Sequence, residues 1–535
     1  MNSSQQKRLW IVSIGLIFAT LIIVGRLFAF QVIQATTWAD RINDTATVID
    51  VPSRGVIYDR NGAILASNAA DYQINAAPRL IIDADEVATR LSPVLEISRT
   101  EILNLIQADT TNVVLAGRVG TDVAEYIRDL DFEGVQIDAL PRRYYPQGDL
   151  LCHTLGYVDF TGRGGAGLEG FYQRELEGQA ASAQVNISPL ASQQSVIANE
   201  GQDLVLTIDR SLQHLVETQL SRALRDHAAI GGSIIVMDPK TGAILAMASA
   251  PCYSPYTYYE AEEGLLLNPA VSLQHEPGSV MKLVTMAAAL DSGVVTPQST
   301  YYDSGVLEVG GHKTYNWDRS APGETDMTTL LARSLNVGAA GLALDMGSDL
   351  FYDYMQAFGF GRPSGVDLMA EANGQMPLPG SSYWTEAFLA TTAYGQGIAV
   401  TPLQMITAVS ALANDGYMMR PYIVQEIHTH DEVIVTEPRI AGRPIGSQAA
   451  QQVTTMATAA VFREVAEAQV VGYTVAGKTG TAQIAENGVY LPDDVIGSFI
   501  GWLPADEPEV VIYVKLDRPQ SAPWGSQTAA PTFAE

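Results

Sequence analysis

The chain has 535 residues, of which 47% are hydrophobic and 17% charged, so it is long enough for about two to four domains and too apolar to be disordered as a whole. Its 59 acidic residues outnumber 31 basic ones and give a formal net charge of −28, which argues against nucleic acid as a partner. The two cysteines, Cys152 and Cys252, exclude a disulfide framework and a four-cysteine zinc site. They could pair, but two buried free thiols are the favoured interpretation.

The first predicted element is a membrane-spanning helix over residues 9–33. Residues 9–25 carry no charge, and Arg26 can snorkel to the interface so that the helix continues to Ile33. The two basic residues just before this segment predict a cytoplasmic N-terminus and an extracytoplasmic remainder. A cleaved signal peptide is the alternative, but residues 25–28 make a poor cleavage site, so an uncleaved anchor is favoured.

Residues 37 to about 200 alternate short strand-like runs with turns and two helical segments. Strands are expected at 56–58 and 72–75, and helices at 84–91 and 100–107. Residues 180–199 are uncharged and rich in Ser, Ala and Gln, which predicts a loop or linker and a boundary near residue 201.

The second half reads as an α+β domain. A strand at 204–208 and a helix at 210–227 precede a hairpin at 233–247, and a second hairpin follows at 498–514. The segment between the hairpins is largely helical, so the pattern predicts an antiparallel sheet with helices against it. Residues 387–414 are uncharged, but Gly, Pro and polar residues interrupt them, so a buried soluble helix is expected there, and the protein has one membrane anchor.

Three short motifs carry the chemistry. The chain has only six lysines, and Lys282 lies one helical turn after Ser279, where a buried amine could activate the hydroxyl as a nucleophile. The second motif is Ser334-Leu335-Asn336, which alone is as compatible with a helix cap. The third, Lys478-Thr479-Gly480-Thr481, is predicted on a strand, where lysine and threonine hydroxyls would grip a carboxylate and the glycine would let a substrate backbone approach.

The order and spacing of these motifs resemble those of the active-site serine penicillin-recognising enzymes, and the whole chain resembles a class B penicillin-binding protein. Residues outside the motifs support this at 53–62, 143–146, 155–158, 167–169, 358–361, 371, 374, 395–397 and 401–404. The segment 498–504 looks more like the division-type enzymes than the elongation-type ones.

The resemblance implies a penicillin-recognising serine transpeptidase fold, with an antiparallel sheet flanked by helices and a helical subdomain. It implies a cytoplasmic tail at 1–8, the anchor at 9–33, an elongated, mixed pedestal (dimerisation-type) domain at 34–200 and the transpeptidase domain at 201–535. Family members continue past the stretch at 525–533 with a final helix that packs on the sheet. Without that helix an apolar sheet face would be uncovered, so either the sequence is truncated or another element covers this face.

The resemblance also implies residue roles. Ser279 would attack the D-alanyl-D-alanine carbonyl of a stem peptide, and Lys282 would be the base, with Ser334 relaying a proton to the leaving amine. Asn336 would bind the substrate amide, and the terminal carboxylate would lie against Lys478, Thr479 and Thr481 beside Gly480. The backbone N–H groups of Ser279 and Thr481 would form the oxyanion hole.

No metal or cofactor is expected. His428 and His430 have the alternate spacing of a metal pair but no third ligand, so a strand running into a turn is favoured there. The implied partners are peptidoglycan stem peptides on nascent glycan strands, β-lactams as covalent inhibitors, and a SEDS-family glycosyltransferase with other divisome membrane proteins. An elongation-type transpeptidase, a β-lactamase or carboxypeptidase, and a catalytically idle divisome scaffold are the alternatives.

Overall fold

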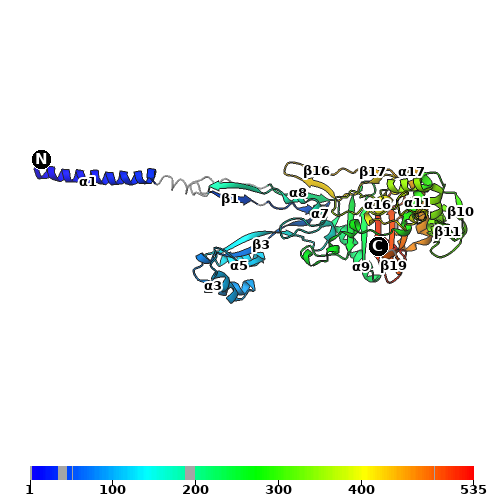
Figure 1. Ribbon diagram of the computed structural model, residues 1–535, viewed down its shortest axis with the longest axis horizontal. Coiled ribbons are helices and arrows are strands. Elements are labelled where there is room, and N and C mark those ends of the chain that lie inside the picture. The colour runs from blue at the N-terminus through cyan, green and yellow to red at the C-terminus, as the bar shows by residue number, and fades with distance from the viewer. Residues whose placement is uncertain (1–2, 34–44, 51, 187–198, 487–488) are drawn as a thin grey trace. The chain divides into compact units, whose positions relative to one another are not determined.

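The computed structural model describes residues 3–33, 45–50, 52–186, 199–486 and 489–535 (Figure 1). The chain forms two compact units, Met1–Ser53 with Gly178–Gly201, and Arg54–Glu177 with Gln202–Glu535.

The first unit contains the N-terminal helix and a two-stranded ribbon. Helix α1 (Ser3–Phe28) continues through a π-helical turn at Ala29–Ile33, and its segment Trp10–Val32 is long and apolar enough to cross a membrane, which fits a single-pass anchor. Strand β1 (Thr45–Asp50) pairs antiparallel with β6 (Ala181–Asn186). The prediction that residues 180–199 form only a loop or linker is therefore wrong for β6. This strand is stabilised by pairing with β1, which is distant in the chain, and its polar sequence gives no strand signal.

The second unit begins with a seven-stranded sheet of order β16-β15-β7-β2-β3-β4, in which β5 also pairs with β3. Its strands are β2 (Ile57–Tyr58), β3 (Ile64–Ala76), β4 (Val113–Val119), β5 (Val135–Tyr144), β7 (Asp203–Leu206), β15 (Val424–His428) and β16 (Val433–Val435). Helices α3 (Ala84–Leu95), α4 (Arg99–Ile106) and α5 (Thr121–Asp129) pack with β3 and β4 around a small apolar core.

A buried ion triad lies beside this sheet. Glu169 on α7 (Gly167–Phe171) is fully buried, and each of its carboxylate oxygens lies 2.6 Å from a guanidinium Nε, one of Arg54 and one of Arg143. All three residues belong to the stretches that carry the family resemblance. Their pairing gives those stretches a physical reason, because a buried carboxylate needs opposite charges and hydrogen bonds around it.

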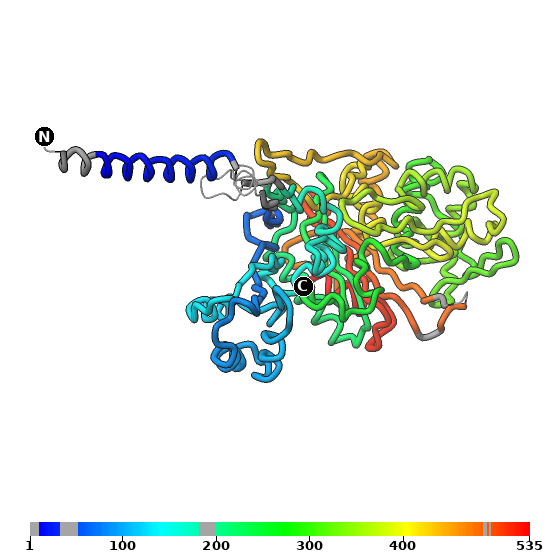
Figure 2. The backbone as a smooth tube through the Cα atoms, turned by 60° about the vertical axis from the view of Figure 1, so that its left-hand side comes forward, coloured from blue at the N-terminus to red at the C-terminus, as the bar shows by residue number. Residues whose placement is uncertain are grey.

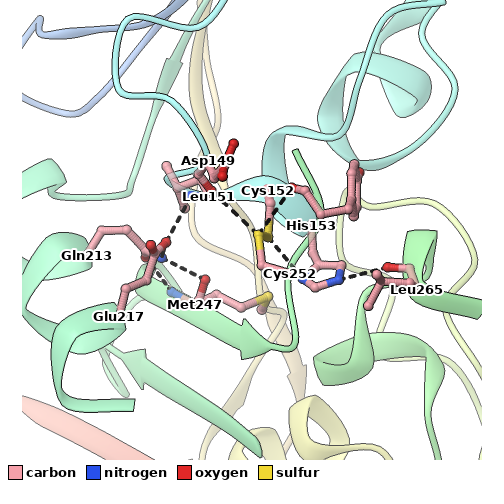
Figure 3. The surroundings of a disulfide bond; sticks show 10 residues. Asp149, Leu151, Cys152, His153, Gln213, Glu217, Met247, Cys252 and Leu265 are labelled. Atoms are coloured by element: carbon pink, nitrogen blue, oxygen red, sulfur yellow. Dashed lines mark hydrogen bonds between the residues drawn. A yellow bond between two sulfur atoms is a disulfide. The ribbon is translucent and has the colours of Figure 1, made fainter. Parts of the chain in front are cut away.

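The two cysteines form a disulfide, so the interpretation as two buried free thiols is wrong (Figure 3). Cys252 is exposed, and Cys152 begins the short helix α6 (Cys152–Leu155). The backbone N–H of Leu151 donates to Glu217 Oε1 (2.9 Å), and the ring of His153 contacts the Leu265 carbonyl (3.0 Å). The two cysteine Cα atoms lie 6.3 Å apart, although the residues are separated by 100 positions in the chain.

The predicted antiparallel sheet is present, with five strands in the order β18-β19-β20-β8-β9. They are β8 (Gly231–Met237), β9 (Ile244–Ala250), β18 (Ala476–Glu486), β19 (Val489–Leu503) and β20 (Val510–Asp517). Figure 2 shows the red C-terminal strands beside green strands of the first hairpin, a pairing in which Tyr513 lies opposite Ile235. Every pairing in this sheet is antiparallel.

Alternate residues of these strands enter two different cores. Ile235 and Met237 join the main core, whereas Ile234 and Val236 face the other side of the sheet. The main core contains the helices that position the site: α10 (Pro269–Ser272), α11 (Met281–Asp291), α12 (Met327–Ala332), α13 (Asn336–Met346), α14 (Ser348–Ala357), α15 (Glu386–Thr392), α16 (Pro402–Ser410) and α17 (Ser447–Glu464). The single buried helix predicted over residues 387–414 is instead two shorter helices, α15 and α16, both with buried residues.

Helices α9 (Arg210–Asp226) and α18 (Ala529–Ala534) pack on the other face of the sheet. The rings of Phe499 and Phe533 lie 4.7 Å apart there, and Phe499 is fully buried. These two helices cover most of the face for which truncation or cover by another element was expected, although Val510 and Ile512 stay partly exposed.

Candidate active site

Ser279 lies in a tight 3-10 turn, Gly278–Val280, that leads directly into the buried helix α11. Gly278 has φ +58°, and a Cβ atom there would come within 2.8 Å of the Thr481 carbonyl oxygen. The backbone N–H of Gly278 donates to the Gly395 carbonyl (3.0 Å). The glycine thus allows the turn that carries Ser279 to pack directly against strand β18.

Lys282 brings the first two motifs together. Its side chain is fully buried on α11, and its Nζ lies 3.0 Å from Ser279 Oγ. The same Nζ lies 2.7 Å from the Ser334 carbonyl oxygen, 3.2 Å from Ser334 Oγ and 2.6 Å from Asn336 Oδ1. Lys282, Ser279 and the Ser-x-Asn motif therefore form one hydrogen-bonded cluster.

The loop between α12 and α13 presents the second motif. Ser334 takes a left-handed conformation with φ +58°, an unusual one for a side-chain-bearing residue, and Asn336 begins α13. Asn336 Nδ2 donates to the Tyr315 carbonyl (3.0 Å), which leaves its Oδ1 directed at Lys282.

The third motif lies on β18, as predicted, at the edge of the five-stranded sheet. Lys478 is buried, and its Nζ contacts the carbonyl (3.1 Å) and Oγ1 (3.3 Å) of Thr479. A Cβ on Gly480 would lie 2.3 Å from Ser498 Oγ and 3.1 Å from the Pro277 carbonyl oxygen. The glycine is thus required by the packing of β18 on β19 and on the turn that carries Ser279, a reason that sequence reasoning did not give.

Both lysines have depressed pKa values. Burial lowers the pKa of Lys478 to about 7. Burial first, and then the charge of Lys478, hold the pKa of Lys282 well below its usual range. A neutral amine beside a serine hydroxyl can accept its proton, so this cluster has the groups that serine acyl transfer requires.

Known proteins match along the whole chain. Residues 232–535 match the penicillin binding protein transpeptidase domain, and residues 49–206 match the penicillin-binding protein dimerisation domain. The stage V sporulation protein D of Bacillus subtilis is 32% identical over 549 residues, covering 99% of this chain and 84% of that protein. The chain belongs to the class B penicillin-binding proteins.

Other class B penicillin-binding proteins agree with this assignment. The peptidoglycan D,D-transpeptidase FtsI of Escherichia coli is 29% identical, covering 90% of this chain and 82% of that one. Penicillin-binding protein 2X from Streptococcus thermophilus superposes with a TM-score of 0.78 at 25% identity, covering 92% of this chain and 79% of that one. Penicillin-binding protein 3 from Mycobacterium tuberculosis in complex with aztreonam superposes with a TM-score of 0.71 at 29% identity, covering 91% of this chain and 95% of that one.

Sequence reasoning missed two tryptophans beside the motifs of this penicillin-binding protein. The rings of Trp317 and Trp524 meet edge to face with centroids 5.1 Å apart. Trp317 Nε1 donates to the carbonyl of Arg333, the residue before Ser334, whereas Trp524 precedes Gly525, whose N–H donates to Thr481 Oγ1. The pair links the second and third motifs. In the sequence, Trp524 directly precedes the family stretch at 525–533, whereas no motif adjoins Trp317.

Glu276 was also missed, although it stands three residues before Ser279. Its carboxylate accepts hydrogen bonds from the Gly397 backbone N–H and from the Tyr490 hydroxyl. Burial raises the pKa of this carboxyl and that of the Tyr490 hydroxyl.

The two histidines considered as a metal pair, His428 and His430, lie at and just after the end of a strand. His428 ends β15, as predicted, and its Nε2 lies 2.7 Å from a carboxylate oxygen of Glu426. Within the described ranges, no group of three or more His, Cys, Asp or Glu side chains is placed to hold a metal ion.

Proposed function

We propose that this protein cross-links peptidoglycan through an acyl-enzyme on Ser279. The chain is a peptidoglycan D,D-transpeptidase of the class B type, as its family and its relatives of that name indicate. The observation that supports Ser279 as the nucleophile is the position of Lys282 Nζ, 3.0 Å from Ser279 Oγ and hydrogen-bonded to Ser334 and Asn336.

Acylation starts when neutral Lys282 accepts the Ser279 proton and Ser279 Oγ attacks the carbonyl carbon of the penultimate D-alanine. The tetrahedral intermediate collapses by breaking the C–N bond, and the terminal D-alanine leaves as an amine. That amine takes a proton from the Ser334 hydroxyl, which is reprotonated by the Lys282 ammonium 3.2 Å away. An acceptor amine on a neighbouring strand then attacks the ester and restores Ser279.

The remaining motif residues hold the substrate. Lys478, Thr479 and Thr481 bind the terminal carboxylate, with Gly480 between them, and Asn336 binds the substrate amide. The backbone N–H groups of Ser279 and Thr481 stabilise the oxyanion, and such donors are worth about 3–4 kcal/mol each in transition-state stabilisation.

The test is the intact mass of the full chain in detergent before and after benzylpenicillin. A stable adduct of one drug mass, absent from Ser279→Ala, is expected. Hydrolysis of benzylpenicillin without an accumulating adduct would identify a β-lactamase instead. A folded protein that does neither would favour an idle scaffold, a role that a Ser279→Ala strain able to grow would also support.

We infer further that the enzyme serves septal wall synthesis. Relatives named FtsI and the similarity of residues 498–504 to division-type enzymes support this. A SEDS-family glycosyltransferase and other divisome membrane proteins are the proposed partners, with Arg26 in the anchor as a contact point. Depletion should produce filaments without septa; round or swollen cells would indicate the elongation role.

We also propose the topology and domain limits given by the sequence. They are a cytoplasmic tail at 1–8, a plasma-membrane anchor at 9–33, a pedestal at 34–200 and an extracytoplasmic transpeptidase domain at 201–535. Protease added outside intact spheroplasts should digest the transpeptidase domain and spare a tag placed at the N-terminus. Digestion of that tag with sparing of the domain would reverse the orientation.

A further inference from the structure

Glu276 connects the nucleophile turn to two other parts of the site. Its Oε1 accepts a hydrogen bond from the Gly397 backbone N–H (2.8 Å), and the Tyr490 hydroxyl lies 3.0 and 3.1 Å from its two carboxylate oxygens. The carboxylate is thus shared between the loop that supports Ser279 and the β18–β19 hairpin, and it has no role in the chemistry proposed above.

The turn before Ser279 is firmly held at its base. The backbones of His275 and Val400 exchange two hydrogen bonds of 2.9 Å, and Gly278 donates to Gly395. A Cβ on Gly395 would lie 2.1 Å from the Gly278 carbonyl oxygen, so the two segments are in direct backbone contact. Glu276 therefore projects from a rigid platform, and what it binds is held relative to Ser279.

The distal end of the β18–β19 hairpin needs such an anchor. The ladder is regular from Ala476 to Gln483, but the register shifts before Ala485, after which Ala485 lies opposite Tyr490. A register shift bends a hairpin and weakens its coupling to the rest of the sheet. The Tyr490 hydroxyl supplies a bond to the platform at that point, although the residue is 41% exposed.

A peptide substrate must pass this distal end. The outer edge of β18 has no partner strand in the described sheet, so an extended peptide can add there through backbone hydrogen bonds. Its carboxylate would be held at Lys478, Thr479 and Thr481. Its scissile carbonyl must reach Ser279, whose turn packs against Thr481. The rest of the stem peptide therefore continues beyond Thr481 along residues 483–486, whereas a small β-lactam ends near Thr481.

We propose that Glu276 and Tyr490 form a latch that fixes the distal β18–β19 hairpin beside the nucleophile turn and so positions peptide substrates for reaction with Ser279. The inference rests on the proposed function, because it assumes that a stem peptide lies along β18. Tyr490 is a positioning residue, and its hydroxyl acts on peptide binding through the hairpin.

The experiment compares two substrates on the full chain in detergent. Tyr490→Phe should raise KM for a pentapeptide ending in D-alanyl-D-alanine about tenfold, as expected for the loss of one hydrogen bond to a charged group, with kcat nearly unchanged. The second-order rate of acylation by benzylpenicillin should stay within about twofold. Glu276→Ala, which also loses the Gly397 contact, should slow both reactions, and adding Tyr490→Phe to it should have no further effect.

Tyr473→Phe is the matched control, since it removes an exposed tyrosine hydroxyl just before the opposite end of β18. It should change neither the KM for the pentapeptide nor the rate of acylation by benzylpenicillin. Hydrogen exchange gives a readout independent of catalysis: the amides of residues 482–486 should exchange faster in Tyr490→Phe, and no faster than in the wild type in the control Tyr473→Phe. An unchanged pentapeptide KM, unchanged exchange, or equal losses for both substrates would overturn the latch. A wild-type chain that forms no benzylpenicillin adduct would overturn the proposed function, and the substrate role of the latch would fall with it.

Discussion

Lys282 Nζ lies 2.6 Å from Asn336 Oδ1 and 2.7 Å from the Ser334 carbonyl oxygen, and both of these oxygens can only accept hydrogen bonds. A neutral amine has two protons and one lone pair. If the protons go to these two acceptors, the lone pair is left for the Ser279 hydroxyl 3.0 Å away. Ser334 and Asn336 thus direct the lone pair of a neutral Lys282 toward Ser279, in addition to the substrate role proposed for Asn336.

Asn336→Asp tests this arrangement with an almost isosteric change. A carboxylate against Nζ favours the ammonium form and raises the pKa of Lys282, so the base is lost at neutral pH. We expect acylation by benzylpenicillin to fall at least about tenfold at pH 7 and to recover partly as the pH rises. The pH profile of the acylation rate measures this, and a loss that is the same at every pH would indicate substrate binding alone.

Lys478 should set the alkaline limb of the pH profile in the free enzyme. Its pKa is lowered to about 7 by burial, and it must be charged to attract a carboxylate, so kcat/KM should decline as the pH rises through about 7. Lys478→Arg keeps its charge and should remove that decline, even if the absolute rate is lower. Lys240→Arg, at an exposed lysine, should leave the profile unchanged.

Gly278→Ala should damage the site through a clash with β18. Both Gly278 and Gly293 have positive φ values, +58° and +74°, but only at Gly278 would a Cβ meet a backbone atom, at 2.8 Å. Gly293→Ala should therefore cost about 1–2 kcal/mol of stability and leave acylation intact. Gly278→Ala should slow acylation more than tenfold; similar acylation rates in the two variants would contradict the close approach.

Glu169→Ala should be strongly destabilising. It leaves the buried Arg54 and Arg143 without their counter-ion, a change that costs about 3–5 kcal/mol in the free energy of unfolding. Asp109→Ala, which removes the exposed partner of Arg79, is the control and should change the free energy of unfolding by less than about 0.5 kcal/mol. Denaturant titration of both variants gives the comparison.

The disulfide predicts a thiol count and a stability change. The unreduced protein should take up no alkylating label, and the reduced, unfolded protein should take up two. Cys152→Ser should lower the free energy of unfolding by about 2–4 kcal/mol, because the bond closes a loop of about 100 residues in the unfolded chain. Label uptake before reduction would contradict the bond.

The sequence carried the fold class and the three motifs because local patterns encode them. Apolar runs separated by turn residues marked the hairpins, and Ser279 and Lys282 were expected on one helical face. Contacts between residues distant in the chain have no such local pattern. Neither Tyr490 opposite Glu276 nor Trp317 against Trp524 can be read from spacing, because each pair depends on how the strands and loops fold together. The same reason explains the missed disulfide and strand β6.

The seven-stranded sheet contains strands from both sides of the boundary near residue 201, so the two sides are expected to fold together. Strand β7, which follows it, pairs on one side with β15 and on the other with β2 from the N-terminal region, where Ile57 lies opposite Leu204. A chain that started at residue 201 would present β7 as an open edge, with exposed backbone donors and acceptors that favour aggregation. A soluble enzyme for biochemistry should therefore retain β2 and β3.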